Sequence, residues 1–181
     1  MFITRLLAPA LALLATSTAT SVVTPVPTER RLNVTAVSAE YGHSTLECWE
    51  VDTPYFVSDD PATIGARMAN LGNVSTLSWT VAPAGQYVGP HHAPNNQWVV
   101  LIQGFGEIGL VNDNSTSAFV TPGNSGLIFA ADTPDVSSDG HTSRYLGNTE
   151  SVYLQIPTLD GMIPEHDILH MGPCDTEELT G

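Results

Sequence analysis

The sequence predicts a single all-β domain, a sandwich or barrel built from many short strands. From about residue 36 onward, short runs of Val, Ile, Leu, Phe, Tyr and Trp are separated by Gly, Pro, Asn and Asp, the pattern of strands joined by turns. Residues 76–81 alternate with a period of two, which puts Leu77, Trp79 and Val81 on one face of a strand. Evenly spaced short strands without an internal repeat favour a sandwich or a barrel.

The chain begins with the features of a secretory signal peptide. Residues 1–19 carry Arg5, then an apolar run, then small residues. The run is too short to span a bilayer, and a short N-terminal anchor is the alternative. Residues 20–35 are rich in Thr, Val and Pro and predict an extended segment. The domain itself is expected over residues 36–165, followed by an acidic C-terminal tail at 166–181.

Further strands are expected inside this domain. Residues 97–102, 107–111, 125–130 and 151–156 are short apolar runs bounded by turn-forming residues, which is typical of buried strands. Residues 61–71 predict either a short helix or a loop.

The charge balance restricts the partners. The chain has 5 Lys and Arg against 19 Asp and Glu, a net charge of −14. So acidic a surface repels nucleic acids and anionic membranes, so neither is an expected partner. Together with the leader, the composition predicts a protein that is secreted or held in the lumen of the secretory pathway.

Two further features agree with an oxidising compartment. Cys48 and Cys174 are the two cysteines, and an even number in a secreted chain predicts one disulfide; two free thiols are the alternative. Sequons at Asn33, Asn73 and Asn114 predict N-linked glycosylation.

One segment carries a family resemblance. Gly85, His91, Gln97 and Gly104 have the spacing of the first signature of the cupin superfamily, which this stretch resembles. Metal-bearing cupins have a second histidine where this chain has Ala93, and a glutamate where it has Gln97. His92 lies beside His91, but strand alternation points it to the opposite face unless a bulge re-aims it.

A second segment extends the resemblance. Residues 123–133, followed by a loop and then residues 140–144, look like the second cupin signature. His141 then takes the place of the late metal-binding histidine. The resemblance covers roughly residues 75–157 and implies a cupin jelly-roll β-barrel with one inward-facing pocket.

The candidate site follows from these two segments. His91, His141 and Gln97 are the expected catalytic residues, in acid/base or hydrogen-bonding roles. Substrate contacts are expected from Asp132, Tyr87 and Trp79. The alternative is a relic site in which the imidazoles and the amide merely satisfy one another.

The departures from the signature also affect metal binding. Losing an imidazole and the only anionic ligand removes two strong ligands, so no cofactor is expected. The alternative is a divalent metal (Fe, Mn, Ni, Cu or Zn) on His91 and His141, completed by water or Asp132. His166 and His170 would form an i, i+4 pair on a helix, and we expect them to be surface histidines.

The resemblance implies a secreted enzyme that acts on a small organic molecule. Secreted cupins that look like this one occur in fungi, where small cupins often accompany secondary-metabolite pathways, so a tailoring step (isomerisation, cyclisation or dehydration) in such biosynthesis is the expected reaction. A metal-dependent cupin oxygenase and a non-catalytic cupin that binds a small molecule or sugar are the alternatives. Cupins often form homodimers by strand exchange, which the early β segments would permit.

Overall fold

The computed structural model describes residues 30–180. The predicted leader at 1–19 and residues 20–29 lie outside them. Regular structure in the described part is almost entirely β, with only short 3₁₀ helices, which confirms the all-β class. None of these helices has the length and apolar character needed to cross a membrane. The elements are β1 (Arg31–Glu40), β2 (His43–Pro54), β3 (Phe56–Val57), β4 (Arg67–Met68), β5 (Ser78–Ala82), β6 (Tyr87–His91), β7 (Gln97–Gln103), β8 (Gly106–Leu110), β9 (Ser117–Val120), η1 (Asn124–Gly126), β10 (Leu127–Ala130), β11 (His141–Tyr145), β12 (Ser151–Pro157), η2 (Leu159–Gly161), β13 (His166–Met171) and η3 (Glu178–Thr180).

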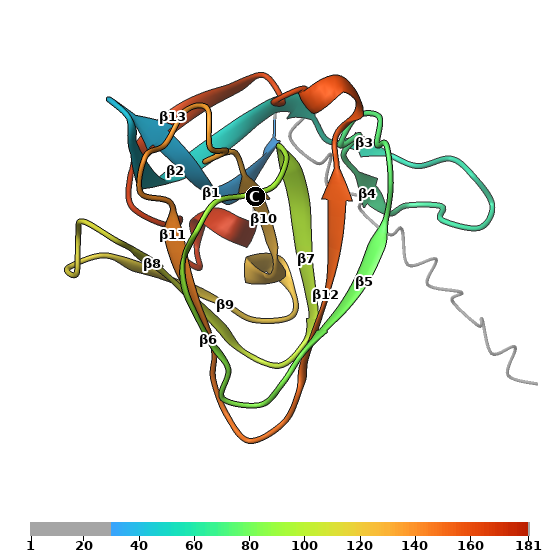
Figure 1. The fold of residues 1–181 in the computed structure, drawn as a ribbon. Helices are drawn as coiled ribbons and strands as arrows, with labels where there is room; N and C mark the ends of the chain where they lie inside the picture. Colours follow the sequence, from blue (N-terminus) through green and yellow to red (C-terminus); the bar gives the residue numbers. More distant parts are fainter. Residues whose placement is uncertain (1–29, 181) are drawn as a thin grey trace, which may run out of the picture.

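Two sheets make up the body of the structure (Figure 1). The larger has the order β13-β2-β1-β10-β7-β12-β5, and the smaller has the order β6-β11-β8-β9. The pairing of β1 with β10 is parallel, whereas the pairs inside the smaller sheet are antiparallel. No strand pairing joins these two sheets within residues 30–180, so the described part is not a closed barrel. The jelly roll implied by the resemblance stays an expectation.

A tight turn fixes the start of β2 beside the future site. Tyr41 and Gly42 both have positive φ, 51° and 82°, and they connect the paired residues Glu40 and His43. Two consecutive left-handed residues are the geometry of a two-residue hairpin turn. The Ser138 N–H donates to the Gly42 carbonyl oxygen at 2.9 Å, which ties the loop before β11 to this turn.

Two apolar clusters hold the sheets in place. In the first, the Phe129 ring lies between Trp49 and Trp98, with centroid distances of 5.6 Å and 4.8 Å. The second draws side chains from both sheets: Val37, Leu46, Leu101, Ile108, Ala118, Val120 and Ile128. These side chains come from both sheets and are buried in one cluster, so the two sheets pack against each other. Burial of their apolar surface stabilises that packing.

The predicted strands within the domain are confirmed, with small shifts at their ends. Residues 97–102 lie in β7, 151–156 in β12, and the runs at 107–111 and 125–130 overlap β8 and β10. Residues 61–71 contain turns and the two-residue β4 and no helix.

The alternation predicted for residues 76–81 is confirmed, but the placement of Trp79 in the cavity wall is wrong. Leu77, Trp79 and Val81 do alternate, but they are exposed, and the Trp79 side chain is 65% exposed. β5 is the edge strand of the larger sheet, and its alternate residues Thr80 and Ala82 are less exposed, so the apolar side chains lie on the outer face.

The C-terminal region is also a correction. Residues 166–171 form β13, which pairs with β2, so this part is an edge strand and the predicted tail does not begin at 166. His166 and His170 therefore do not form an i, i+4 helical pair. The His166 ring stacks on Trp49 at 3.6 Å.

The predicted disulfide is confirmed. Cys48 in β2 is bonded to Cys174 beyond β13, and both are buried together with Leu179. The bond closes a loop with a sequence separation of 126 residues, which in a chain-entropy account stabilises the fold by about 4–5 kcal/mol.

The three sequons lie in different surroundings. Asn73 and Asn114 are exposed. Asn33 lies in β1, where its Nδ2 donates to the Glu178 carbonyl oxygen at 3.1 Å and its Oδ1 is buried.

Candidate functional site

A cavity lies between the two sheets. Its volume is about 120 Å³, several times the space that one enclosed water requires. The larger sheet contributes side chains from β1, β7, β10 and β12, and the smaller sheet from β6, β8, β9 and β11. Half of the lining residues are apolar, and the other half carry polar groups: His91, His92, Gln97, Glu107, His141, Ser143, Arg144, Tyr145, Tyr153 and Gln155.

His141 is held by a buried carboxylate. Its Nδ1 lies 2.6 Å from Oδ2 of Asp132, a residue whose exposure is 0%. The same carboxyl accepts hydrogen bonds from the Ser44 hydroxyl at 2.8 Å and from the Ala93 N–H at 3.3 Å. An ionised carboxylate can only accept, so Nδ1 of His141 carries the proton, and Nε2 is left with its lone pair.

His91 lies directly beside His141. The two residues are paired across β6 and β11, and their ring centroids are 4.3 Å apart. Nδ1 of His91 donates to the Gly89 carbonyl oxygen at 2.8 Å, because a carbonyl has no proton to give. The tautomer of His91 is therefore fixed in the same way as that of His141.

The surroundings favour the neutral form of His91. Burial lowers its pKa below the usual value, and the neighbouring His141 and His92 lower it further. The hydrogen bond to Gly89 and the charge of Asp132 oppose this shift. A neutral imidazole with a lone pair on Nε2 is a proton acceptor at neutral pH.

Gln97 and His92 complete the polar part of the cavity. Gln97 is buried at the start of β7, opposite the smaller sheet, so the structure brings His91, His141 and Gln97 to one cavity. His92 also borders the cavity, and its Nε2 is buried without a hydrogen-bond partner. The pairing of β6 with β11 is irregular next to His141, and such an irregularity re-aims side chains.

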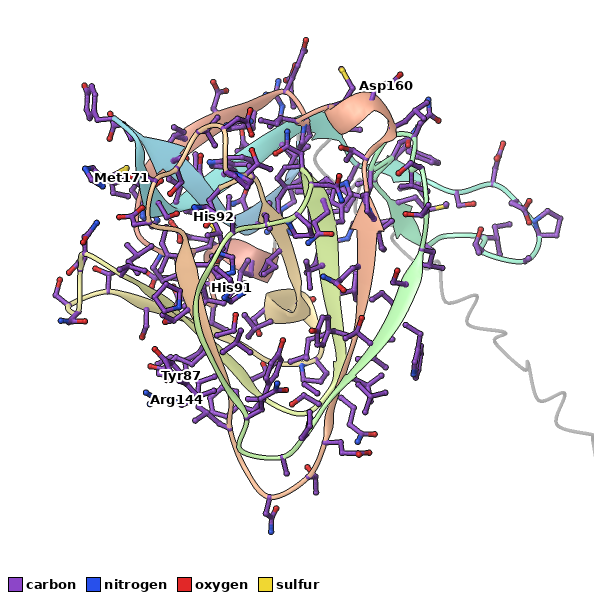
Figure 2. All side chains as sticks on the ribbon, in the orientation of Figure 1. Tyr87, His91, His92, Arg144, Asp160 and Met171 are labelled. Atoms are coloured by element: carbon purple, nitrogen blue, oxygen red, sulfur yellow. A yellow bond between two sulfur atoms is a disulfide. The ribbon has the colours of Figure 1, made fainter. Side chains whose placement is uncertain are left out.

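Two of the expected wall residues lie elsewhere. Trp79 is on the outward face of β5, and Tyr87 is 57% exposed. Figure 2 shows Tyr87 beside Arg144 and away from His91, and the Arg144 guanidinium lies 5.7 Å from the centre of the Tyr87 ring. Tyr87 instead borders an outer groove of about 420 Å³ on the smaller sheet. Side chains of β6 alternate between its two faces, and Tyr87 lies on the face that points away from the cavity.

The aromatic wall that sequence reasoning missed is formed by Tyr145 and Tyr153. Their rings stack at 5.6 Å, one from each sheet. Burial raises the pKa of Tyr145, and its hydrogen bond with Tyr153 raises it further. The signal available was alternation: Tyr153 and Gln155 share one face of β12. Which face is inward could not be read from the strand alone.

The prediction that Asp132 contacts substrate is wrong, because Asp132 does not line the cavity. It lies behind His141 and away from the cavity lining. Its role is therefore to orient the imidazole and to balance its charge, as carboxylates do for histidines in other sites.

A metal does not fit the cavity. His91, His92, His141 and Glu107 all border the cavity, but within residues 30–180 they form no group of three ligand atoms within 4.8 Å of one another, whereas transition-metal sites need three or more strong ligands. Within residues 30–180, three ligand atoms come within 4.8 Å of one another at Cys48, His170 and Glu178. By distance this outer group could hold a metal ion, but Cys48 Sγ is bonded to Cys174, and the disulfide lacks the thiolate that binds metals.

The chain was also compared with known proteins. No protein-family model and no curated protein matches it, so the geometry described above carries the functional interpretation.

Proposed function

We propose that this chain is an enzyme that moves a proton on a small, partly apolar organic molecule, using His91 and His141 as the acid/base pair. The reaction class is isomerisation, cyclisation or dehydration. The observation that carries the proposal is the pair of imidazoles at the cavity wall, each with Nδ1 fixed by an acceptor.

The two imidazoles are suited to different halves of such a reaction. His91 is kept neutral by burial and can take a proton at Nε2. His141 has the Asp132 carboxylate on its other nitrogen, which stabilises the imidazolium, so it can hold a proton and return it. Rings 4.3 Å apart repel each other when both are charged, which favours one proton shared by the pair.

The rest of the cavity indicates the substrate class. Aliphatic side chains and the Tyr145–Tyr153 stack favour an apolar body. Gln97 can donate to a carbonyl or hydroxyl oxygen, and it can hold an enolate as charge develops. A small molecule with one carbonyl or hydroxyl group fits both requirements. We place the reaction in a secreted or lumenal compartment, consistent with the disulfide.

The proposal is tested by looking for turnover of any compound in a mixture of metabolites. Metabolite extracts of the producing organism are incubated with the full mature chain and followed by mass spectrometry. A substrate should be converted to a product of equal mass, or of mass lower by one water. His91→Gln and His141→Gln should each reduce the rate about 100-fold or more, the usual contribution of a positioned acid or base.

His170→Gln is the matched control, because it removes a histidine beside a carboxylate on the outer surface. It should leave the rate unchanged. Unaltered metabolites that nevertheless co-purify with the chain would show a binding protein and reject the enzyme. Conversion that survives both cavity variants would reject the assignment of His91 and His141.

A further inference from the structure

The Asp132–His141 pair is the inner end of a longer series of hydrogen-bonded side chains. The series starts at His43 on the surface, where Nδ1 lies 3.1 Å from Oδ2 of Asp139. The Ser137 hydroxyl contacts Oδ1 of Asp139 at 2.8 Å, and the Ser44 hydroxyl lies 2.8 Å from that of Ser137. Ser44 then contacts Oδ2 of Asp132 at 2.8 Å. We call His43, Asp139, Ser137, Ser44, Asp132 and His141 the relay chain.

Burial rises steadily along the relay chain. The His43 side chain is 59% exposed and that of Asp139 is 13% exposed. Ser137, Ser44 and Asp132 are all buried. The relay chain thus connects bulk water with the imidazole at the cavity wall, through groups that are increasingly buried.

A hydrogen count shows that the relay chain is incomplete when both carboxyls are ionised. Three oxygen–oxygen contacts of 2.8 Å join Asp132, Ser44, Ser137 and Asp139. Each contact needs one hydrogen, and the two hydroxyls supply two. The third contact is completed only when a carboxyl of the relay chain carries a proton. Buried polar contacts are rarely left unmade, because an unmade one costs about 1–3 kcal/mol.

The backbone does not remove this deficit. The N–H of Gly140 points at the Ser137 oxygen at 3.0 Å, so it uses a lone pair and supplies no hydrogen between the two serines. Asp139 is already well supplied: Ser44 N–H and Asn112 Nδ2 also donate to it. Burial alone would raise the pKa of Asp139, but its hydrogen bonds with the Ser137 hydroxyl, the Ser44 N–H and His43 lower it to about 2.

We propose that the relay chain conducts protons between solvent at His43 and the cavity at His141. Its role in turnover rests on the acid/base function proposed above, whereas proton conduction itself does not.

The step balances without any outside reagent. When Nε2 of His141 takes a proton, its Nδ1 proton passes to Oδ2 of Asp132. The carboxyl proton passes to Ser44, the Ser44 proton to Ser137, and the Ser137 proton to Asp139. Asp139 takes the Ser137 proton at Oδ1, and the carboxylic acid then turns so that this proton faces Nδ1 of His43. His43, which starts with its hydrogen on Nε2, takes the proton at Nδ1 and releases the Nε2 proton to water. Each group gains one proton and loses one, and the reverse sequence reloads His141.

Other titratable or polar groups lie beside the two ends of the relay chain. His91 lies against His141, and His92 acts on His91. At the outer end, Asn112 from the loop between β8 and β9 is the further neighbour of Asp139. Proton exchange must therefore be measured at His141 itself, and not inferred from a pH profile to which all these groups contribute.

The experiment uses the full chain with ¹⁵N-labelled histidine. Saturation of the water signal in NMR reports how fast the His141 Nδ1 proton exchanges with solvent. Ser137→Ala interrupts the relay chain, and we expect exchange to slow about tenfold or more, as for an added barrier of roughly 1.4 kcal/mol. His43→Gln, at the exposed end where folding is not at risk, should slow exchange too, and added imidazole should restore it. His170→Gln is the control and should change nothing.

Whether proton exchange at His141 slows or speeds up in Ser137→Ala distinguishes a proton relay from a network with a purely structural role. A network that only holds the loop in place loosens when Ser137 is removed, so exchange at His141 would then be faster. Faster or unchanged exchange in Ser137→Ala, or a His43→Gln variant with the wild-type rate, would overturn the relay. Because no substrate is involved, this outcome is independent of the turnover test, and failure of one does not imply failure of the other.

Discussion

His141 and His170 each lie beside a carboxylate, and their surroundings give them opposite properties. His141 contacts Asp132 at 2.6 Å in the interior, where both groups are nearly sealed from water. His170 contacts Glu178 at 3.1 Å on the outer edge of β13, where both side chains are about one-third exposed. A histidine–carboxylate pair thus lies inside the cavity wall, and another lies near the disulfide.

The difference shows that burial, more than the pairing itself, decides what such a pair can do. At the surface, water and salt screen the attraction, and ion pairs there contribute little. In the interior, removing one partner leaves the other without hydrogen bonds in a medium of low polarity. The interior pair is therefore held in one tautomer and orientation, which is what acid/base chemistry needs.

The largest expected contrast is in stability. Asp132→Ala removes a buried acceptor from His141, Ser44 and the Ala93 N–H. We expect the free energy of unfolding to fall by about 3–5 kcal/mol, as when one partner of a buried pair is deleted. Glu178→Ala should lower it by about 1 kcal/mol or less. Urea titration of both variants measures the difference, and equal losses would contradict the comparison.

A second contrast compares Gly140, which precedes His141, with Gly172, which lies two residues after His170. Gly140 and Gly172 both have positive φ, 70° and 93°. A Cβ at Gly140 would meet the His91 carbonyl oxygen at 2.3 Å, whereas one at Gly172 would meet nothing within 4 Å.

Gly140→Ala should therefore destabilise the protein by about 2–5 kcal/mol, from left-handed strain together with overpacking. Gly172→Ala should be destabilised by strain alone, about 1–2 kcal/mol. Thermal unfolding of the two variants is the measurement. Gly140→Ala should also move β6 away from β11, visible as changed NMR shifts of His91. If Gly140→Ala proves no worse than Gly172→Ala, the tight approach of β11 to His91 is wrong.

The smallest expected contrast is in pH dependence. Burial lowers the pKa of His91, so the folded state resists protonation and loses stability as the pH falls below about 6.5. The hydrogen bond to the Met171 carbonyl, together with Glu178, raises the pKa of His170. Its contribution to stability is therefore present below about pH 6.5 and is lost as the pH rises through its folded-state pKa.

His91→Gln should make the melting temperature less sensitive to acid, and His170→Gln should make it more sensitive. Melting curves between about pH 5 and 8 test both signs. The same sign for the two variants would show that the exposed and buried sites do not differ as described.

Much of the strand pattern was predictable, because short apolar runs bounded by glycine and proline have few other solutions. Residues 97–102 and 151–156 were found in this way. Residues 166–171 were not, since their apolar side chains are spread over an edge strand with exposed Ile168 and Leu169 and carry no clear alternation. The outward face of β5 was missed for a related reason: alternation gives two faces without saying which one is buried.

The candidate site was predictable only as a set of histidines. Spacing in the sequence indicated His91, Gln97 and His141, which the structure places around one cavity. Tyr87 and Trp79 were assigned to the same wall, yet both face outward, because their strands present them on the other side of the sheet.

By itself, the sequence determined the all-β class, the charge and the two cysteines that are joined. These depend on residue type and local order along the chain. Only the tertiary structure decided that Asp132, Ser44 and Ser137 lie behind His141, since these residues come from β2 and from the loop before β11. Contacts between distant segments depend on how the sheets pack and on the register of β6 against β11, and no local pattern in the sequence encodes either.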